Sequence, residues 1–128
     1  MAERIAWITG ASTGIGHALA LRMAGDGWKI AASARSAETL KTMAMESDGK
    51  IAAHPVDVVD ADGMAEVAAT VWREEGPIDL AVFAAGLHLP LDAAAFDIVP
   101  FRRLIEINFM GVVHGLAGVV PKMVERGT

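Results

Sequence analysis

The amino-acid sequence predicts an α/β fold, a doubly wound parallel sheet with helices on both of its faces. Short apolar runs alternate with amphipathic stretches along the chain, which is the pattern of repeated strand–helix units. The first apolar run leads directly into a glycine-rich turn at residues 10–16, and a helix-like stretch follows at once. A length of 128 residues, 53% of them hydrophobic, fits one domain with a sizeable core.

The expected elements follow from the period of the apolar residues and from the polar and glycine residues that bound each run. We expect strands at residues 4–9, 28–34, 51–56 and 78–84. We expect helices at residues 15–24, 37–45 and 62–73, a short helical turn at 92–96, and a long helix within 100–124 that bends near Pro121. The composition of the second strand predicts that it is buried on both faces.

Helix ends and buried helix faces can be assigned in the same way. Ser36 and Asp60 precede the second and third helices, where short polar side chains accept hydrogen bonds from free backbone N–H groups. The first helix is expected to direct Ile15, Leu19 and Met23 toward the core, since these positions share one face. The third helix is expected to bury Met64, Val67, Ala68 and Val71.

An apolar stretch at residues 105–120 is interpreted as a buried helix, and no membrane partner is expected. The stretch is shorter than a span, it contains Glu106, Asn108 and His114, and two arginines precede it. Small residues flatten one side of this helix, so that a neighbouring helix or sheet can approach closely; they are Gly111, Gly115 and Gly118.

Composition and charge exclude several classes of function. The net charge of −5 comes without the clustered Lys and Arg of a nucleic-acid surface, so we expect no nucleic-acid partner. The absence of cysteine excludes disulfides, thiolate zinc sites and thiol catalysis, and is consistent with a cytoplasmic location. The four histidines lack the spacing of a metal site, so no metal is expected. A strand begins within a few residues of Met1, which leaves no room for a signal peptide.

The glycine-rich turn has the features of a pyrophosphate site. Gly10 permits a sharp turn with positive φ, while Gly14 and Gly16 let backbone N–H groups approach phosphate oxygens and let the helix pack closely on the strand. The first turn of the following helix offers unpaired N–H groups and the positive end of the helix dipole. Because a strand precedes the turn and a helix follows it, the context favours a dinucleotide site over an ordinary strand-to-helix turn.

The spacing Thr9-Gly10-x-x-x-Gly14-x-Gly16 resembles that of the short-chain dehydrogenase/reductase family, and residues 1–128 as a whole resemble that family's first half. The resemblance implies a single Rossmann-like domain whose parallel sheet has the strand order 3-2-1-4 and stops before a fifth strand. It also implies hydride transfer between a nicotinamide and a small-molecule carbonyl or alcohol. The cofactor site in the turn would be formed by Gly10, Ser12, Thr13, Gly14, Ile15 and Gly16.

The end of the second strand decides between NADP(H) and NAD(H). In dinucleotide sites an acidic residue there binds the ribose 2′-hydroxyl of NAD, whereas a nearby arginine accommodates the 2′-phosphate of NADP. Ala34 stands where NAD-preferring members of the resembled family carry Asp, and Arg35 with Ser36 could hold a phosphate through charge-assisted hydrogen bonds. We therefore expect NADP(H) in preference to NAD(H). The alternative for Arg35 is a solvated surface residue.

Two further segments match the family. The pair Asp57-Val58 resembles the acidic and aliphatic residues that flank the adenine ring. Residues 78–86 resemble the strand that ends in the family's N-N-A-G motif, and the resemblance places Ala84, Ala85 and Gly86 at the cofactor. Phe83 and Ala84 replace the two asparagines of that motif, so we expect the hydrogen bonds that these side chains make between central strands to be missing.

Asn108 is the candidate catalytic residue. It matches the helix asparagine that supports a proton relay from the family's active-site lysine through water. An asparagine inside an apolar helix needs a partner, because an unpaired buried amide costs about 1 to 3 kcal/mol. A hydrogen bond to the backbone, without a catalytic role, is the alternative interpretation.

The other catalytic groups of the family are missing from these 128 residues. The sequence contains no tyrosine, whereas the family uses a Tyr-x-x-x-Lys pair for proton transfer and ribose binding, and Lys122 lies on an earlier helix than that lysine. The chain is therefore interpreted as the NADP(H)-binding half of an oxidoreductase, inactive by itself. The alternatives are a non-catalytic dinucleotide-binding or interaction protein, and a fragment of a longer chain.

Self-association is expected from two surfaces. Residues 80–84 form an apolar edge strand without charge or proline, which is a surface that recruits partners. The long helix adds its glycine-flattened side, and in the resembled family the corresponding helix packs against its mate in another subunit. We therefore expect a homo-oligomer.

Overall fold

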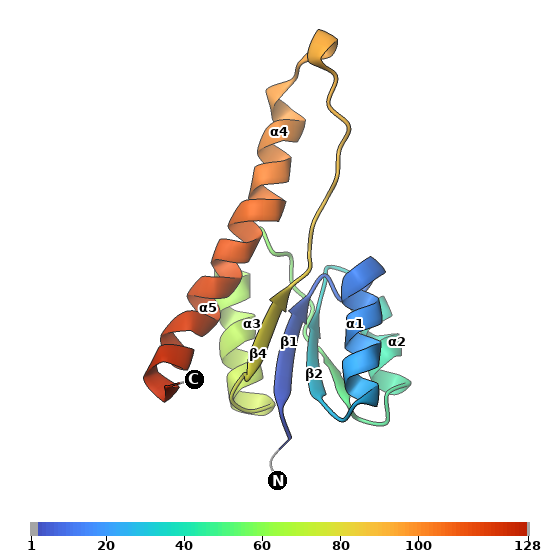
Figure 1. Cartoon of the computed structure of the whole chain (residues 1–128), viewed down its shortest axis with the longest axis vertical. Coiled ribbons are helices and arrows are strands. Elements are labelled where there is room, and N and C mark those ends of the chain that lie inside the picture. Colours follow the sequence, from blue (N-terminus) through green and yellow to red (C-terminus); the bar gives the residue numbers. More distant parts are fainter. Residues whose placement is uncertain (1–2, 128) are drawn as a thin grey trace.

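A four-stranded parallel sheet forms the centre of the computed structural model, which describes residues 3–127. Its strands are β1 (Ile5–Thr9), β2 (Lys29–Ser33), β3 (Ile51–Ala53) and β4 (Leu80–Phe83). They lie in the predicted order β3-β2-β1-β4. Every pair is parallel, so the carboxyl ends of the four strands share one edge of the sheet (Figure 1).

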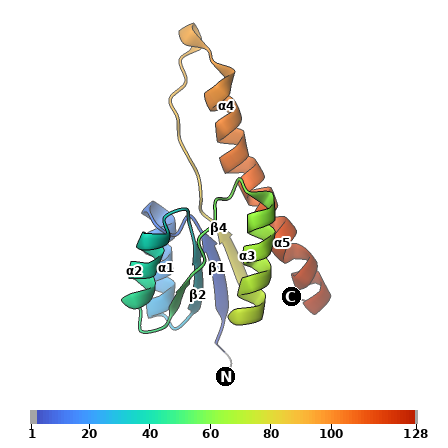
Figure 2. The ribbon, with the colours of Figure 1, turned by 180° about the vertical axis from the view of Figure 1, so that it is seen from behind.

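Helices cover both faces of this sheet (Figure 1 and Figure 2). On one face lie α1 (Gly14–Gly25) and α2 (Ala37–Met45), and on the other lie α3 (Ala61–Glu74) and α5 (Gly111–Arg126). Successive side chains of a strand point to opposite faces. Ile8 of β1 therefore packs in the core under α1 and α2, and its neighbour Trp7 packs in the core under α3 and α5. The predicted doubly wound architecture is confirmed.

Both central strands are buried, as predicted for the second one, and β4 is the predicted edge strand. Every residue of β1 is buried, and so is every residue of β2 except Lys29. A parallel sheet covered on both faces requires this continuous apolar composition. On β4, by contrast, Leu80 is 40% exposed, because only β1 pairs with that strand.

The two predicted helix N-caps are confirmed. The Ser36 hydroxyl accepts a hydrogen bond from the Thr39 N–H at 3.3 Å, and the helix that begins there spans the predicted residues. The Asp60 carboxylate accepts from the Gly63 N–H at 3.0 Å at the start of α3. Each cap satisfies an N–H group that the helix itself leaves free.

The prediction that Ile15 faces the core was wrong. Ile15 is 83% exposed, and the buried residues of α1 are Gly16 and Ala20. The cause is the close approach of α1 to the glycine-rich turn, where a Cβ at Gly16 would collide with the Gly10 carbonyl oxygen. Small residues therefore form the contact face, while Leu19 and Met23 pack at its border.

The long C-terminal helix is interrupted, but not at Pro121. It consists of α4 (Ile98–Ile105), a π-helical turn (Glu106–Met110) and α5, which continues through Pro121 to Arg126. A 3₁₀ turn (Ala93–Ala95) stands at the predicted short helical turn. Figure 1 shows α4 and the segment after β4 extending beyond the carboxyl edge of the sheet.

The glycine-flattened side of α5 packs inside the protein. A Cβ at Gly115 would overlap the Phe83 ring, and a Cβ at Gly118 would lie 2.7 Å from the Ala68 Cβ of α3. The expectation that the glycines let a neighbour approach closely is confirmed. The expectation that this side forms an exposed associating surface was wrong, because the exposed apolar residues of α5 lie elsewhere on the helix, at Val113, Leu116, Val120 and Val124.

The whole stretch Ile98–Arg126 is long and apolar enough to cross a bilayer, by length and composition alone. A single such helix is weak evidence for a membrane span, because core helices of other proteins share the property. The expectation of a buried helix holds only in part: α5 contacts the domain through Gly111, Gly115 and Val119, which are buried, but most of the apolar stretch is exposed.

Candidate functional site

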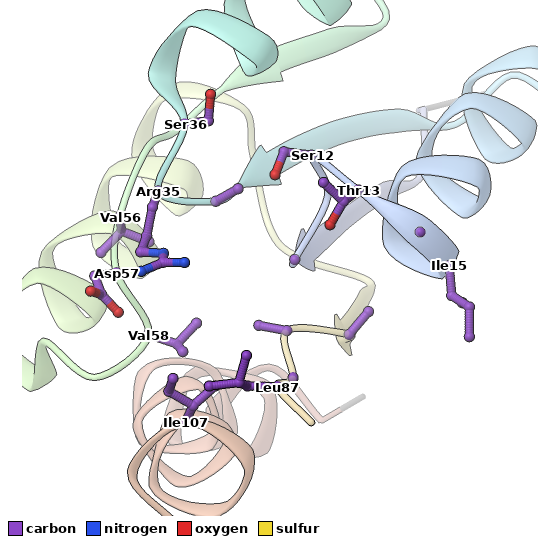
Figure 3. Close-up of a pocket in the computed structure, with 16 residues that line it drawn as sticks. Ser12, Thr13, Ile15, Arg35, Ser36, Val56, Asp57, Val58, Leu87 and Ile107 are labelled. Atoms are coloured by element: carbon purple, nitrogen blue, oxygen red, sulfur yellow. The ribbon is translucent and has the colours of Figure 1, made fainter. Parts of the chain in front are cut away.

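A cavity of about 800 Å³ opens at the carboxyl edge of the sheet, where β1 separates the units that wind to either side. In open parallel sheets this crevice is the usual place for a ligand. Figure 3 shows side chains from four loops and from the π-helical turn around it. Thirteen of the fourteen predicted cofactor residues line it: Gly10, Ser12, Thr13, Gly14, Ile15, Ala34, Arg35, Ser36, Asp57, Val58, Ala84, Ala85 and Gly86.

The turn between β1 and α1 needs glycine for a different reason at each position. Gly10 has a φ of +67°, and a Cβ there would lie 2.5 Å from the Ala85 backbone nitrogen. Gly14 has a φ of +57° with no atom within 4 Å of a Cβ position, so open space adjoins the turn there. Gly16, the predicted residue that does not line the cavity, is buried against the Gly10 carbonyl. These constraints bring the backbone itself to the cavity wall.

The N-terminus of α1 is left open toward the cavity. Thr13 has extended backbone angles at the N-cap, but its side chain makes no capping hydrogen bond, unlike Ser36 and Asp60 at the next two helices. The free N–H groups and the helix dipole together favour a negatively charged group at this point.

The end of β2 brings a cation to the cavity and no carboxylate. Figure 3 shows the Arg35 side chain running from the end of β2 toward Asp57. Ala34 is buried beside it. The Ser36 hydroxyl is already engaged, because it accepts from the Thr39 N–H and donates to the Thr39 hydroxyl oxygen at 2.9 Å. Within residues 3–127 the Arg35 guanidinium forms no hydrogen bond or salt bridge, which leaves it available for a negatively charged group at the cavity.

The loop after β3 forms the opposite wall. Asp57 accepts a hydrogen bond from the Val59 N–H through Oδ1 at 3.2 Å, and Val58 is buried except for its cavity-lining surface. The Val58 carbonyl oxygen lies 2.7 Å from Nδ1 of His114 on α5. The loop is thus fixed both from within and from a helix far away in the sequence.

The end of β4 presents only small residues to the cavity. Ala84, Ala85 and Gly86 line it, whereas Phe83 turns away and meets Trp7 of β1 edge-to-face, with ring centroids 6.0 Å apart. This aromatic contact joins β4 to β1 at the place where the asparagines of the resembled motif are absent.

The Asn108 side chain is hydrogen-bonded to the backbone, but it is not buried. Its residue is exposed in the π-helical turn, its Oδ1 accepts from the Leu87 N–H at 2.7 Å, and its Nδ2 donates to the Leu87 carbonyl at 2.8 Å. The side chain therefore holds the segment after β4 as a neighbouring strand would. It does not line the cavity, but Leu87 does.

Several residues of the site were missed by sequence reasoning. Val56, Leu87 and Ile107 line the cavity, and His114 fixes its wall. Val56 directly precedes the predicted Asp57 and could have been found from strand alternation. The contact between Ile107 and the cavity depends on the π-helical turn, which has no local sequence signal.

A histidine–carboxylate group lies outside this cavity. The adjacent residues Glu74 and Glu75 and the distant His54 hold ligand-type atoms within 4.8 Å of one another. Glu75 is already bonded on both oxygens, to Lys29 Nζ at 3.1 Å and His54 Nε2 at 3.3 Å. The Glu75 carboxylate therefore joins Lys29 of β2 and His54, which follows β3, to the end of α3, whereas Glu74 is exposed.

Comparison with known proteins gives one consistent result. The sequence profile described as short chain dehydrogenase matches residues 4–128. A 2,3-dihydro-2,3-dihydroxybenzoate dehydrogenase of Bacillus subtilis is 34% identical over 96% of this chain and 48% of its own length. The glycine betaine reductase ATRR of Emericella nidulans is 32% identical over 99% of this chain and 10% of its own length.

Solved structures agree with the sequence matches. A short-chain dehydrogenase from Streptomyces avermitilis superposes with a TM-score of 0.92 at 28% identity, covering 99% of this chain and 47% of that one. An actinorhodin polyketide ketoreductase with NADPH gives a TM-score of 0.90 at 28% identity, covering 98% and 50%. The chain spans about half the length of these solved structures and of the Bacillus relative.

Proposed function

The chain belongs to the short-chain dehydrogenase family, and on that premise we propose that it is the NADP(H)-binding half of an oxidoreductase. The nicotinamide, when bound, supplies or accepts a hydride at the carbon of a small carbonyl or alcohol. The observation that carries the proposal is the cavity itself, which joins an open helix N-terminus to a cationic side chain at the end of β2.

The residues present fit such a nucleotide. The N–H groups at the start of α1 would hold the pyrophosphate, and the open space beside Gly14 leaves room for it. The small residues Ala84, Ala85 and Gly86 would let a ribose pass the end of β4. Val58 and Asp57 would flank the base on the wall after β3.

The preference for NADP(H) follows from charge at the end of β2. Arg35 can bind a 2′-phosphate through charge-assisted hydrogen bonds, and Ala34 offers no carboxylate to a 2′-hydroxyl. The structural relative with NADPH supports this choice.

Asn108 enters the proposal as support for a proton relay and not as the proton donor. Both polar atoms of its side chain are bonded to Leu87, so the amide fixes the segment after β4 at the cavity wall. The proton itself needs a group of suitable pKa, and these 128 residues contain no tyrosine.

The second candidate function is a dinucleotide-binding or interaction protein without catalysis. The observation behind it is that the cavity holds the features for binding a nucleotide without needing any group that transfers a proton. The reading frame beyond Thr128 discriminates between the two: a downstream Tyr-x-x-x-Lys supports the enzyme, and a stop codon supports the binding protein.

Titration calorimetry tests the nucleotide site directly. NADP⁺ and NAD⁺ are titrated separately into the 128-residue chain, and NADP⁺ is expected to bind more tightly. Tighter binding of NAD⁺ would overturn the cofactor preference. Binding of neither nucleotide would overturn the site.

A further inference from the structure

The peptide unit between Val58 and Val59 is held at both of its polar atoms. Its carbonyl oxygen lies 2.7 Å from His114 Nδ1, and its N–H donates to Asp57 Oδ1 at 3.2 Å. A carbonyl oxygen only accepts, so Nδ1 of His114 must carry the proton. The plane of this peptide is therefore fixed by α5 from one side and by its own loop from the other.

The same helix also holds the Val58 side chain. Gly111 lies one turn before His114, and a Cβ at Gly111 would lie only 2.8 Å from Val58 Cγ2. Val58 is 8% exposed and that surface lines the cavity. Backbone and side chain of one wall residue are thus both positioned by α5.

We infer that His114 is a positioning residue for recognition of the nucleotide base. By fixing the Val58–Val59 peptide it keeps the Val59 N–H donating to one oxygen of Asp57, which leaves the other oxygen to accept a hydrogen bond from the amino group of adenine. The inference rests on the proposed nucleotide site and adds a residue that does not itself line the cavity. A wall fixed before binding lowers the entropy lost when the ligand is ordered.

The sequence alone hides this role. His114 and Val58 are 56 positions apart and belong to different elements. A merely structural histidine would contribute to folding stability alone, whereas a positioning residue must also change the discrimination between bases. The two roles therefore predict different binding data.

Two variants separate the roles. His114→Leu removes the donor and keeps a side chain of similar bulk, while His114→Asn keeps an N–H donor close to the position of Nδ1. The ligands are NADP⁺ and its hypoxanthine analogue, deamino-NADP⁺, which lacks the amino group that would donate a hydrogen bond to Asp57. Calorimetry measures the affinity of each variant for each of the two ligands and compares it with the affinity of the unmodified chain.

Loss of the donor is expected to weaken NADP⁺ binding roughly 5- to 30-fold, the effect of one lost hydrogen bond of about 1 to 2 kcal/mol. Deamino-NADP⁺ should be affected less, so that the preference for adenine shrinks, and H114N should restore both. If a folded H114L variant binds NADP⁺ with unchanged affinity and base preference, the inference is overturned. If the unmodified chain binds neither ligand, the proposed function itself is overturned.

A second measurement needs no variant. The ¹⁵N NMR shifts of the His114 ring in its neutral form should show that the proton is on Nδ1. A proton on Nε2 alone would contradict the bond to Val58 and overturn the inference, even if H114L does not fold.

Discussion

Phe83 on β4 stands edge-to-face against Trp7 on β1, with an interplanar angle of 87°. This contact lies where the related N-N-A-G motif would place polar side chains, so an apolar contact joins the two strands instead. The Phe83 ring also fills the space beside Gly115 of α5. One aromatic side chain therefore connects β4, β1 and the helix.

Gly115→Ala is expected to destabilise the fold by about 1 to 3 kcal/mol, because the new methyl group would overlap a ring that is itself packed on Trp7. Urea unfolding measures the change. Gly25→Ala is the matched control, since a Cβ there meets no atom within 4 Å, and it should be neutral or slightly stabilising. Equal stability of the two variants would contradict the packing described for Phe83.

Arg35→Gln is expected to weaken NADP⁺ binding about tenfold or more while leaving NAD⁺ nearly unchanged, because only NADP⁺ carries a 2′-phosphate. Ala34→Asp should reverse the preference in favour of NAD⁺. Arg73→Gln is the control for net charge, since Arg73 is an exposed residue near the end of α3. An equal loss in the Arg73 variant would show that the effect is general electrostatics.

Asn108→Ala is expected to free the Leu87 N–H, which should then exchange with solvent much faster, because no strand covers it. Asn108→Asp keeps an acceptor for that N–H but loses the donor to the Leu87 carbonyl. Hydrogen exchange at Leu87 should therefore remain slow in the Asp variant. Equal exchange rates of the Leu87 N–H in the two variants would contradict the role of Asn108 in holding the segment after β4.

The 128-residue chain is expected to show no dehydrogenase turnover. Without a proton donor of the family type, general acid–base catalysis worth about 10²- to 10⁴-fold is missing. Oxidation of NADPH with a panel of aldehydes and ketones provides the assay. The control is the same preparation from cells without the gene, and turnover above that background would refute the expectation.

The family resemblance predicted the strand order, whereas the features predicted from the residues themselves are those that neighbouring residues determine. Ser36 caps α2 because the N–H groups it serves follow directly, and Gly10 adopts positive φ because the turn is local. The exposure of Ile15 could not be predicted in this way, since it depends on how closely α1 approaches the turn. The bond between Asn108 and Leu87 spans 21 residues and depends on a π-helical turn without a sequence signal.

Self-association is expected through a different surface from the one that the sequence indicates. The glycine side of α5 packs inside the protein, so we expect association through the exposed apolar residues Leu116 and Val120, which lie one turn apart, together with the open edge of β4. We expect a molar mass above that of one chain that rises with concentration in light scattering. Leu116→Glu should lower it, because a charge would be buried in the contact.

Lys41→Glu on α2 is the control, since it adds negative charge on the opposite face of the sheet, away from α5. It should leave the molar mass unchanged. A monomer at all concentrations, or an equal response of the two variants, would contradict association through α5. Slow amide exchange along Leu80–Phe83 only in the associated species would assign the β4 edge to the same contact, because unpaired strand N–H groups exchange freely unless another chain covers them.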